Sequence, residues 1–306
     1  MRVVITGGAG FIGSNLAERL LGEGMEVVAI DDLSNGDECN LDGIDAELVI
    51  GSILDAELLD HTFDGADCIV HFAARGSVPK SVADPVATHE RNNTGTLVVL
   101  EAVRRAGGPH TVVASSSSVY GAVPDLPKHE DLATRPMSPY AVSKLATEWY
   151  ALAYQHSYGL PSMVFRFFNV YGPRQPAGHA YAAVIPAWIS AALAGDPVVV
   201  YGDGLQSRDF TYVDSVTSVV SDAITRRVVD PIPVNLAFGG GSTLLELAGM
   251  LAEIIGEPVE VQHAESRRGD IRHSSADPSR LLALFPDIAP IGLDEGLART
   301  VDWWRR

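Results

Sequence analysis

Tyr140 and Lys144, four residues apart, could together perform acid/base chemistry. Residues four apart lie on one face of an α-helix, so the Tyr140 phenol and the Lys144 ammonium would point into the same space. Because a nearby cation favours the phenolate, we expect the pKa of Tyr140 to lie below its usual value of about 10. Such a tyrosine could exchange a proton near neutral pH. The spacing also occurs by chance in helices without a catalytic role, so the surrounding chain must give it meaning.

The segment around the pair has the composition of a helix. Pro139 directly precedes Tyr140, and proline is favoured in the first turn of a helix. The residues that follow are mostly good helix formers. The sequence therefore predicts a helix over residues 139–158.

The N-terminal thirty residues or so have the pattern strand, glycine turn, helix, strand. A β-branched run at 2–6 leads into Gly7-Gly8-Ala9-Gly10-Phe11-Ile12-Gly13, an amphipathic helix starts near Ser14, and a second apolar strand covers 27–30. In this setting the glycines let the chain turn sharply and let a pyrophosphate approach the helix N-terminus. We interpret the pattern as a dinucleotide-binding unit. A tight turn without a ligand is the alternative.

Asp31 closes the second strand, eighteen residues after Gly13. A carboxylate at this point can accept hydrogen bonds from the adenosine ribose. From Asp31 to Val49 the chain has no Arg or Lys that could meet a 2′-phosphate. The sequence therefore predicts NAD rather than NADP as cofactor.

Further strands are expected at 47–49, 68–72, 110–114, 163–168 and 234–237, most of them separated by helices such as 93–106. This alternation predicts an α/β fold with a doubly wound parallel sheet of the Rossmann type. Ligands bind such sheets outside the carboxyl ends of the strands. The pattern changes after about residue 172, which indicates a smaller C-terminal α/β domain. We expect one domain of residues 1–172 plus about 213–238, and a second of 173–212 plus 239–306.

The 306-residue chain has 46% hydrophobic and 20% charged residues, as globular proteins do. Its net charge of -17 argues against nucleic acid as a partner. Cys39 and Cys68 do not suggest a disulfide framework, and the apolar run around Cys68 predicts a buried thiol. A signal peptide and apolar runs of about 18 residues are lacking, so we expect a cytoplasmic protein that does not bind membranes. No metal site is expected.

Taken together, five segments closely resemble an extended short-chain dehydrogenase/reductase of the nucleotide-sugar epimerase/dehydratase family. They are Gly7–Gly13, Asp31, the serine loop Ser115–Gly121, Tyr140-x-x-x-Lys144, and Arg166–Arg174. Within the family the chain is most similar to the UDP-glucose 4-epimerase group. The resemblance implies NAD as cofactor and a UDP-sugar as substrate, bound partly by the C-terminal domain. It also implies a homodimer formed through two long helices, the one after Asn92 and the one carrying Tyr140.

The resemblance also assigns roles by position. It implies that the catalytic residues are Ser116, Tyr140 and Lys144. The residues expected around the cofactor are Gly7, Gly10, Phe11, Ile12, Gly13, Asp31, Asp32, Asn35, Gly36, Ser52, Ile53, Phe72, Ala73, Ala74, Asn92, Ser115, Tyr140, Lys144 and Phe167. The residues expected around the substrate are Arg75, Ser77, Ser116, Ser117, Ser118, Tyr140, Asn169, Val184, Tyr201, Arg208, Arg267 and Asp270. Two positions depart from the family pattern: Ser52 stands where an Asp is usual, and Phe167 where many epimerases have Tyr.

The serine loop bears on the reaction. Sugar 4,6-dehydratases of the family carry Asp-Glu just before Val-Tyr-Gly, and UDP-glucuronate decarboxylases often have Glu at the second position, whereas this chain has Ser117-Ser118. The expected activity is therefore 4-epimerisation of a UDP-hexose through a transient 4-keto sugar. UDP-glucose and UDP-galactose are the first candidates, and UDP-glucuronate and UDP-galacturonate or a UDP-N-acetylhexosamine are the next. Alternatives are another sugar-modifying enzyme on the same scaffold, such as a decarboxylase, dehydratase or reductase, and a non-catalytic NAD-binding regulator. Arg75 could meet the carboxylate of UDP-glucuronate, or it could be a surface or diphosphate-binding arginine.

Overall fold

The computed structural model describes residues 1–177, 183–266 and 272–306. These residues form two compact units. Unit 1 comprises Met1–Pro124, Glu130–Phe167 and Thr217–Leu236, and unit 2 comprises Asp125–His129, Phe168–Val216 and Ala237–Arg306.

Unit 1 is built on a parallel sheet of seven strands in the order β11-β6-β5-β4-β1-β2-β3. The strands are β1 (Arg2–Thr6), β2 (Glu26–Asp31), β3 (Glu47–Ile50), β4 (Cys68–His71), β5 (His110–Ser116), β6 (Ser162–Phe167) and β11 (Val234–Leu236). Central strands such as β4 are buried along their whole length, which explains their continuous apolar composition. The strand order reverses between β1 and β4, so the expected doubly wound Rossmann-type sheet is confirmed.

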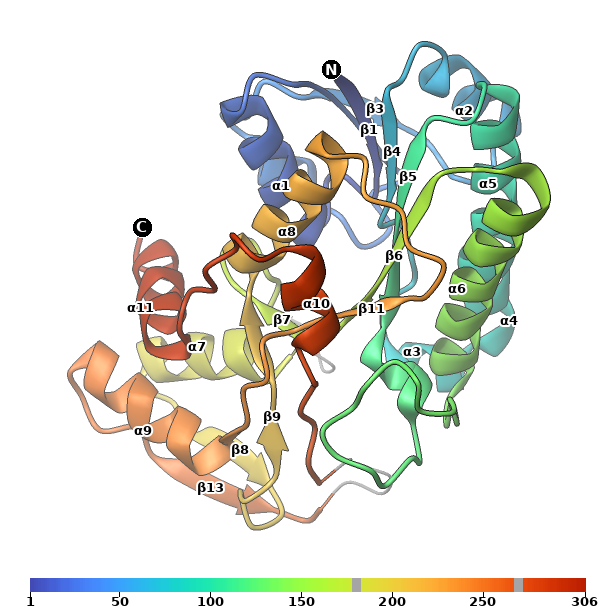
Figure 1. Cartoon of the computed structure of the whole chain (residues 1–306). Coiled ribbons are helices and arrows are strands. Elements are labelled where there is room, and N and C mark those ends of the chain that lie inside the picture. Colours follow the sequence, from blue (N-terminus) through green and yellow to red (C-terminus); the bar gives the residue numbers. More distant parts are fainter. Residues whose placement is uncertain (178–182, 267–271) are drawn as a thin grey trace. The chain divides into compact units, whose positions relative to one another are not determined.

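Helices cover both faces of this sheet (Figure 1). They are α1 (Phe11–Gly22), α2 (Ala56–Phe63), α3 (Val78–Ala83), α4 (Pro85–His89), α5 (Gly95–Arg105), α6 (Pro139–Tyr158) and α8 (Val213–Thr225), with single turns η1 (Glu38–Leu41), η2 (Glu90–Thr94) and η3 (Ser117–Tyr120). Figure 1 shows α1 and α8 on one face and α2, α5 and α6 on the other. Arg19 of α1 donates to the Thr217 hydroxyl of α8 at 3.0 Å, which ties the two helices together.

Helix α6 begins and ends at the predicted residues because both ends have local signals. The Ser138 hydroxyl accepts the Ala141 N–H at the N-terminus, and Gly159 takes a left-handed conformation at the C-terminus. Helix α1 begins at Phe11 rather than near Ser14, because the extended backbone of Gly10 already caps it. The helix expected from residue 93 begins as the π-helical turn η2, in which the Thr96 and Thr147 hydroxyls both hydrogen-bond to the Asn92 carbonyl.

Unit 2 contains shorter elements. They are β7 (Asn169–Tyr171), α7 (Val184–Ala194), β8 (Val198–Tyr201), β9 (Ser207–Arg208), β10 (Phe210–Tyr212), β12 (Ser242–Thr243), α9 (Leu244–Ile255), β13 (Val261–Ala264), α10 (Ser279–Leu284) and α11 (Leu293–Trp304). The strands pair in twos, β7 with β10, β9 with β12, and β8 with β13. Asp125–His129 joins this unit because the Lys128 backbone bonds to those of Ser275 and Asp277, each at 2.8 Å.

Two further expectations can be compared with the structure. Cys68 is buried, and neither cysteine forms a disulfide, as predicted; Cys39 is exposed. Across the described ranges, no helix is long and apolar enough to cross a membrane.

Candidate active site

The three residues expected to be catalytic meet at the carboxyl end of β5. Tyr140 and Lys144 lie one turn apart on α6, which packs against β5. Lys144 is 5% exposed, and its ammonium donates to the Ala114 carbonyl at 2.9 Å. Ser116 is the last residue of β5, and its hydroxyl hydrogen-bonds to the Tyr140 phenol. The arrangement therefore provides a phenol, a hydroxyl and an ammonium in one place.

The start of α6 is fixed by serine hydroxyls. The fully buried Ser81 of α3 accepts the Tyr140 N–H at 3.0 Å, and Ser138 accepts the Ala141 N–H at 3.1 Å. Ser143 donates to the Tyr140 carbonyl at 2.8 Å. Both backbone groups of Tyr140 are thus held by side chains, which fixes the point from which its ring projects.

Burial controls the ionisation of the pair. It raises the pKa of Tyr140, an effect that the Ser116 hydrogen bond partly offsets. Burial also lowers the pKa of Lys144 from 10.5 to about 8. The expected lowering of the Tyr140 pKa by Lys144 is therefore wrong for the protein by itself, since removal from water disfavours the phenolate and the ammonium alike.

A buried ion pair lies one turn beyond Lys144 on the same helix. Glu148 is fully buried and binds the Arg166 guanidinium of β6 through both carboxylate oxygens, at 3.0 Å and 2.5 Å. Glu148 also accepts the Ser115 hydroxyl at 2.8 Å, while Arg166 donates to the Tyr120 phenol at 2.9 Å. Tyr120 in turn donates to Asn235 of β11 at 2.7 Å. This network joins α6 to the ends of three neighbouring strands.

A second buried network joins the end of β1 to Asn92. His71 Nδ1 lies 2.8 Å from the Thr6 hydroxyl, and Nε2 lies 3.0 Å from the Thr96 hydroxyl. Since Thr96 donates its proton to the Asn92 carbonyl, His71 must donate from Nε2 and accept at Nδ1. Burial lowers the pKa of His71 to about 3, so the ring is neutral at physiological pH. The Asn92 side chain donates to Ser143 at 2.8 Å, which ties this network to α6.

The glycine loop has the close backbone approaches that a dinucleotide site requires. A Cβ at Gly7, whose φ is +74°, would lie 2.7 Å from the Ala73 nitrogen, and a Cβ at Gly13 would collide with the Gly7 carbonyl. Gly10 is the N-cap of α1 and has no side chain, so no capping side chain accepts the first-turn N–H groups. Such N–H groups can bind an anion. These residues fit a pyrophosphate at the N-terminus of α1.

Asp31 fits the ribose that such a dinucleotide would carry. It is 8% exposed at the end of β2 and accepts the N–H groups of Ala9 at 3.1 Å and Leu33 at 2.9 Å. Burial raises its pKa, which the backbone N–H donors partly offset. A Cβ at Gly36 would lie 2.7 Å from the Asp31 carboxylate, so the backbone at Gly36 passes close to Asp31.

The comparisons with known proteins agree with this geometry. Residues 3–237 match the model of the NAD dependent epimerase/dehydratase family. The chain belongs to this family.

The similarity of this chain to its relatives extends over its whole length. A UDP-glucose 4-epimerase from Mycolicibacterium smegmatis is 38% identical over 314 residues, covering 100% of this chain and 99% of that protein. A UDP-glucuronate 4-epimerase from Thermodesulfobacterium geofontis is 32% identical over 317 residues, covering 98% and 95%. The structure of Thermus thermophilus UDP-glucose 4-epimerase in complex with NAD has a TM-score of 0.90 at 38% identity, covering 100% of this chain and 99% of that chain.

The remaining residues expected around the cofactor of this epimerase/dehydratase lie at the same edge of the sheet. Phe72 follows β4 and Phe167 ends β6, the strands on either side of β5. Their rings meet edge to face, with centroids 5.5 Å apart. Ser52 accepts the Leu54 N–H at 3.2 Å. Residues after β1, β2, β3 and β4 complete this group, namely Phe11, Ile12, Asp32, Asn35, Gly36, Ile53, Ala73 and Ala74.

Residues expected around the sugar have mixed environments. The Arg75 guanidinium forms an ion pair with Asp84 at 3.2 Å. Ser77 caps α3 by accepting the Lys80 N–H at 3.3 Å. Ser117 and Ser118 form the turn η3, and the buried Ser118 hydroxyl has no hydrogen-bond partner within the ranges that the structure covers. The Ser118 hydroxyl thus has unused hydrogen-bonding capacity, whereas Arg75 is already paired.

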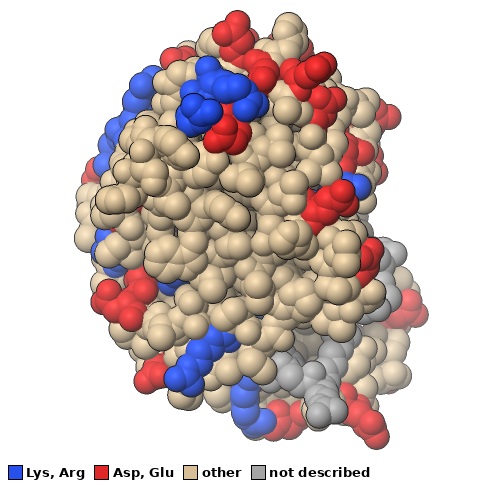
Figure 2. Space-filling view, turned by 90° about the vertical axis from the view of Figure 1, so that its right-hand side faces the viewer, with Lys and Arg blue, Asp and Glu red and all other residues tan. Residues whose placement is uncertain are grey.

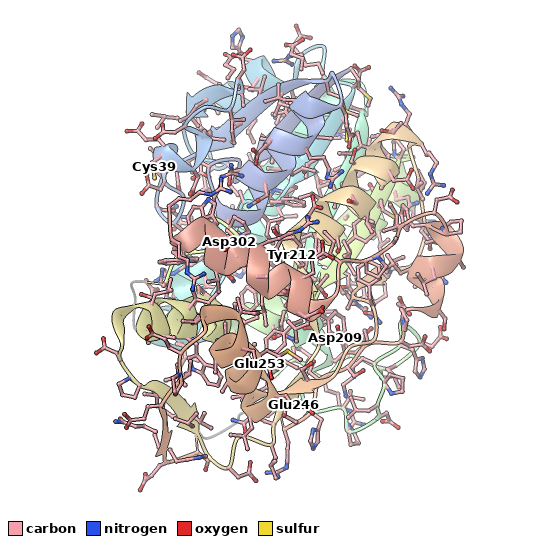
Figure 3. The ribbon with its side chains drawn as sticks, turned by 90° about the vertical axis from the view of Figure 1, so that its left-hand side faces the viewer. Cys39, Asp209, Tyr212, Glu246, Glu253 and Asp302 are labelled. Atoms are coloured by element: carbon pink, nitrogen blue, oxygen red, sulfur yellow. The ribbon has the colours of Figure 1, made fainter. Side chains whose placement is uncertain are left out.

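Unit 2 contains the residues expected to hold the nucleotide. Asn169 of β7 donates from its side chain to the Asp209 carbonyl at 3.1 Å, and Arg208 of β9 donates to the Ser207 carbonyl at 2.9 Å. Asp209, labelled in Figure 3, accepts the Ala276 N–H at 3.0 Å, and burial raises its pKa to about 6. Val184 begins α7 and Tyr201 ends β8. Arg267 and Asp270 lie outside the described residues.

Three positioning residues were not predicted from the sequence. Glu148 could have been found, because it follows Lys144 by one helical turn. Arg166 stood in a recognised segment but without a role. Ser81 had no local signal, since its function depends on how α3 packs against α6.

Proposed function

We propose that this member of the NAD-dependent epimerase/dehydratase family is a 4-epimerase of a UDP-hexose. The observation that carries the proposal is the meeting of Ser116, Tyr140 and Lys144 beside a serine turn that supplies no further acid or base. Relatives named UDP-glucose 4-epimerase and UDP-glucuronate 4-epimerase support it. The substrate pair is UDP-glucose and UDP-galactose, with UDP-glucuronate and UDP-galacturonate as the second candidate.

Tyr140 removes the proton of the sugar 4-hydroxyl and later returns it. Bound NAD supplies the hydride acceptor and donor for C4. Ser116 hydrogen-bonds to the phenol and shares the hydroxyl proton, which stabilises the oxygen as it gains charge. Lys144 is held by the Ala114 carbonyl. In its protonated form, Lys144 provides the cation that favours the Tyr140 phenolate. Because the proton and the hydride both return, the sugar ends as its C4 epimer without net oxidation.

We assign the nucleotide to unit 2. Planar guanidinium groups such as that of Arg208 suit diphosphate oxygens, and the Asn169 amide suits a polar nucleotide group. Uridine diphosphate would be held firmly and the sugar loosely, because the 4-keto sugar must present both faces to the same hydride donor. Binding energy from the remote nucleotide then positions the reacting carbon.

The proposal is tested by incubating the purified protein with UDP-glucose and no added NAD, and by identifying the product by chromatography and NMR. UDP-galactose is the expected product. Loss of water, loss of carbon dioxide from UDP-glucuronate, or stoichiometric reduction of added NAD would contradict epimerisation and indicate another enzyme of this scaffold.

Arg75 distinguishes the two substrate pairs. Because its guanidinium is paired with Asp84, we favour the neutral hexoses over the hexuronates. If Arg75 nevertheless binds a sugar carboxylate, Arg75→Ala should reduce turnover of UDP-glucuronate by at least about tenfold relative to UDP-glucose. Equal effects on the two sugars would argue against that role.

We further propose a homodimer, paired through α6 and α4. The resemblance implied α6 and the helix after Asn92, but α5 (Gly95–Arg105) carries no exposed large apolar side chain. Large apolar side chains are exposed on α4 and α6: Val86 is 76% exposed, Val142 51%, Trp149 60% and Tyr150 39%. Figure 2 shows a broad area free of charged side chains on the side of the molecule where α6 lies. An exposed apolar patch of this kind is typical of a protein interface. Cytoplasmic location stays a prediction.

A further inference from the structure

The loop after β2, residues 32–36, is contacted by two cations that are distant in sequence. Arg91 of η2 forms an ion pair with Asp32 and donates to the Ser34 hydroxyl at 3.3 Å. The Lys80 ammonium of α3 donates to the Asn35 side-chain oxygen at 2.8 Å. The loop thus follows Asp31, the carboxylate that fits a ribose, and is bordered by positive charge.

The positions of Arg91 and Lys80 bear on how the site distinguishes NAD from NADP. Between Asp31 and Val49 the sequence has no Arg or Lys, yet the fold brings Arg91 and Lys80 to this stretch. An arginine near the end of the second strand is what accommodates the 2′-phosphate of NADP, whereas a carboxylate there favours the 2′-hydroxyl of NAD. Both kinds of group are present at this loop.

The Asp32 carboxylate contacts both the loop backbone and Arg91. One of its oxygens accepts the Ser34 N–H at 3.0 Å, which closes a tight turn, and the other is paired with Arg91. The Arg91 side chain is 39% exposed and that of Asp32 is 27% exposed, so the pair stands at the surface, where an incoming phosphate can reach it. A paired arginine offers fewer N–H groups to a phosphate, and the Asp32 charge also repels it.

We propose that Asp32 is a specificity-determining residue that occupies Arg91 and thereby excludes NADP from the dinucleotide site. The proposal rests on the assignment of this loop to that site. Asp31 excludes the 2′-phosphate directly, and Asp32 does so by withholding the guanidinium that would bind it. Neutralising Asp32 converts Arg91 into a phosphate ligand without removing the Asp31 carboxylate.

The variant Asp32→Asn tests this, because its amide oxygen can still accept the Ser34 N–H while the charge is lost. Nucleotide-free protein is titrated with NAD and, separately, with NADP by isothermal calorimetry. We expect Asp32→Asn to bind NADP about tenfold more tightly than wild type, with NAD affinity changed by less than about threefold. The double variant Asp32→Asn with Arg91→Met should return to the wild-type affinity for NADP.

Asp37→Asn is the matched control. Asp37 is an exposed carboxylate of the same loop region that accepts the Cys39 N–H at 3.1 Å, so this variant has the same change of charge without touching Arg91. It should leave both affinities unchanged. The proposal is overturned if Asp32→Asn does not improve NADP binding, if the gain persists without Arg91, or if Arg91→Met alone weakens NAD binding. Failure of the wild type to bind NAD would instead refute the proposed dinucleotide site.

Discussion

At the scale of single residues, the site combines groups whose pKa values burial shifts toward the neutral form. Lys144 and His71 both have lowered pKa values, and Tyr140 has a raised one. The charge that the reaction needs must therefore be stabilised by specific hydrogen bonds rather than by solvent. Ser116 and the Ala114 carbonyl provide such bonds.

Lys144 gives the stability of the protein a defined pH dependence. Its pKa is about 8 in the folded protein and about 10.5 when unfolded, so the unfolded state binds more protons between these values. The free energy of unfolding should therefore rise with pH over this window, and the full cost of burying the ammonium is present below it. Relative to Lys144→Met, wild type should gain roughly 2 kcal/mol between pH 7.5 and 9.5, measured by urea unfolding. A constant difference between the two proteins would contradict the lowered pKa.

The buried pair of Glu148 and Arg166 predicts a large loss of stability. Glu148→Gln would leave the Arg166 guanidinium buried without its carboxylate. We expect the free energy of unfolding to fall by roughly 3–5 kcal/mol. Glu253→Gln on the exposed surface of α9 (Figure 3) is the control and should change it by less than about 0.5 kcal/mol. Equal stability of the two variants would show that the pair does not hold α6 to β6.

At the scale of elements, the contact between the glycine loop and α1 determines whether a dinucleotide can bind. Gly13→Ala would drive a Cβ into the Gly7 carbonyl, whereas a Cβ at Gly22 of the same helix meets no atom within 4 Å. Gly13→Ala should therefore abolish the rise in melting temperature that NAD causes. Gly22→Ala should keep that rise and add up to about 1 kcal/mol of stability. A normal NAD response in Gly13→Ala would contradict the fit of this loop to a pyrophosphate.

Elements were predictable where their signals are local. Apolar runs identified all seven strands of the sheet, and Ser138-Pro139 and Gly159 marked both ends of α6. The turn η2 and the short helices α3 and α4 were not predicted, because their form depends on contacts such as Ser81 with Tyr140 and Thr147 with Asn92. The contact of Arg91 with Asp32 joins residues far apart in sequence and could not be read from either segment.

At the scale of the whole molecule, the exposed apolar face of α6 predicts self-association. Trp149→Glu places a charge in the centre of this face and should yield monomers in light-scattering chromatography, while wild type elutes as a dimer. Val229→Glu is a control outside this face, because Val229 is an apolar residue with 43% exposure that belongs to neither helix. A monomeric wild type, or a dimer that survives Trp149→Glu, would exclude α6 as the interface.

The central claim is reversible oxidation at C4 with Tyr140 as the acid and base, and one isotopic measurement tests it most directly. UDP-glucose deuterated at C4 is incubated with the protein, and the deuterium in the UDP-galactose formed is measured by mass spectrometry. The account predicts that the product keeps its deuterium at C4, and that Tyr140→Phe lowers the rate by about 10²–10⁴-fold. Replacement of the C4 deuterium by solvent hydrogen, or an unchanged rate in Tyr140→Phe, would contradict it.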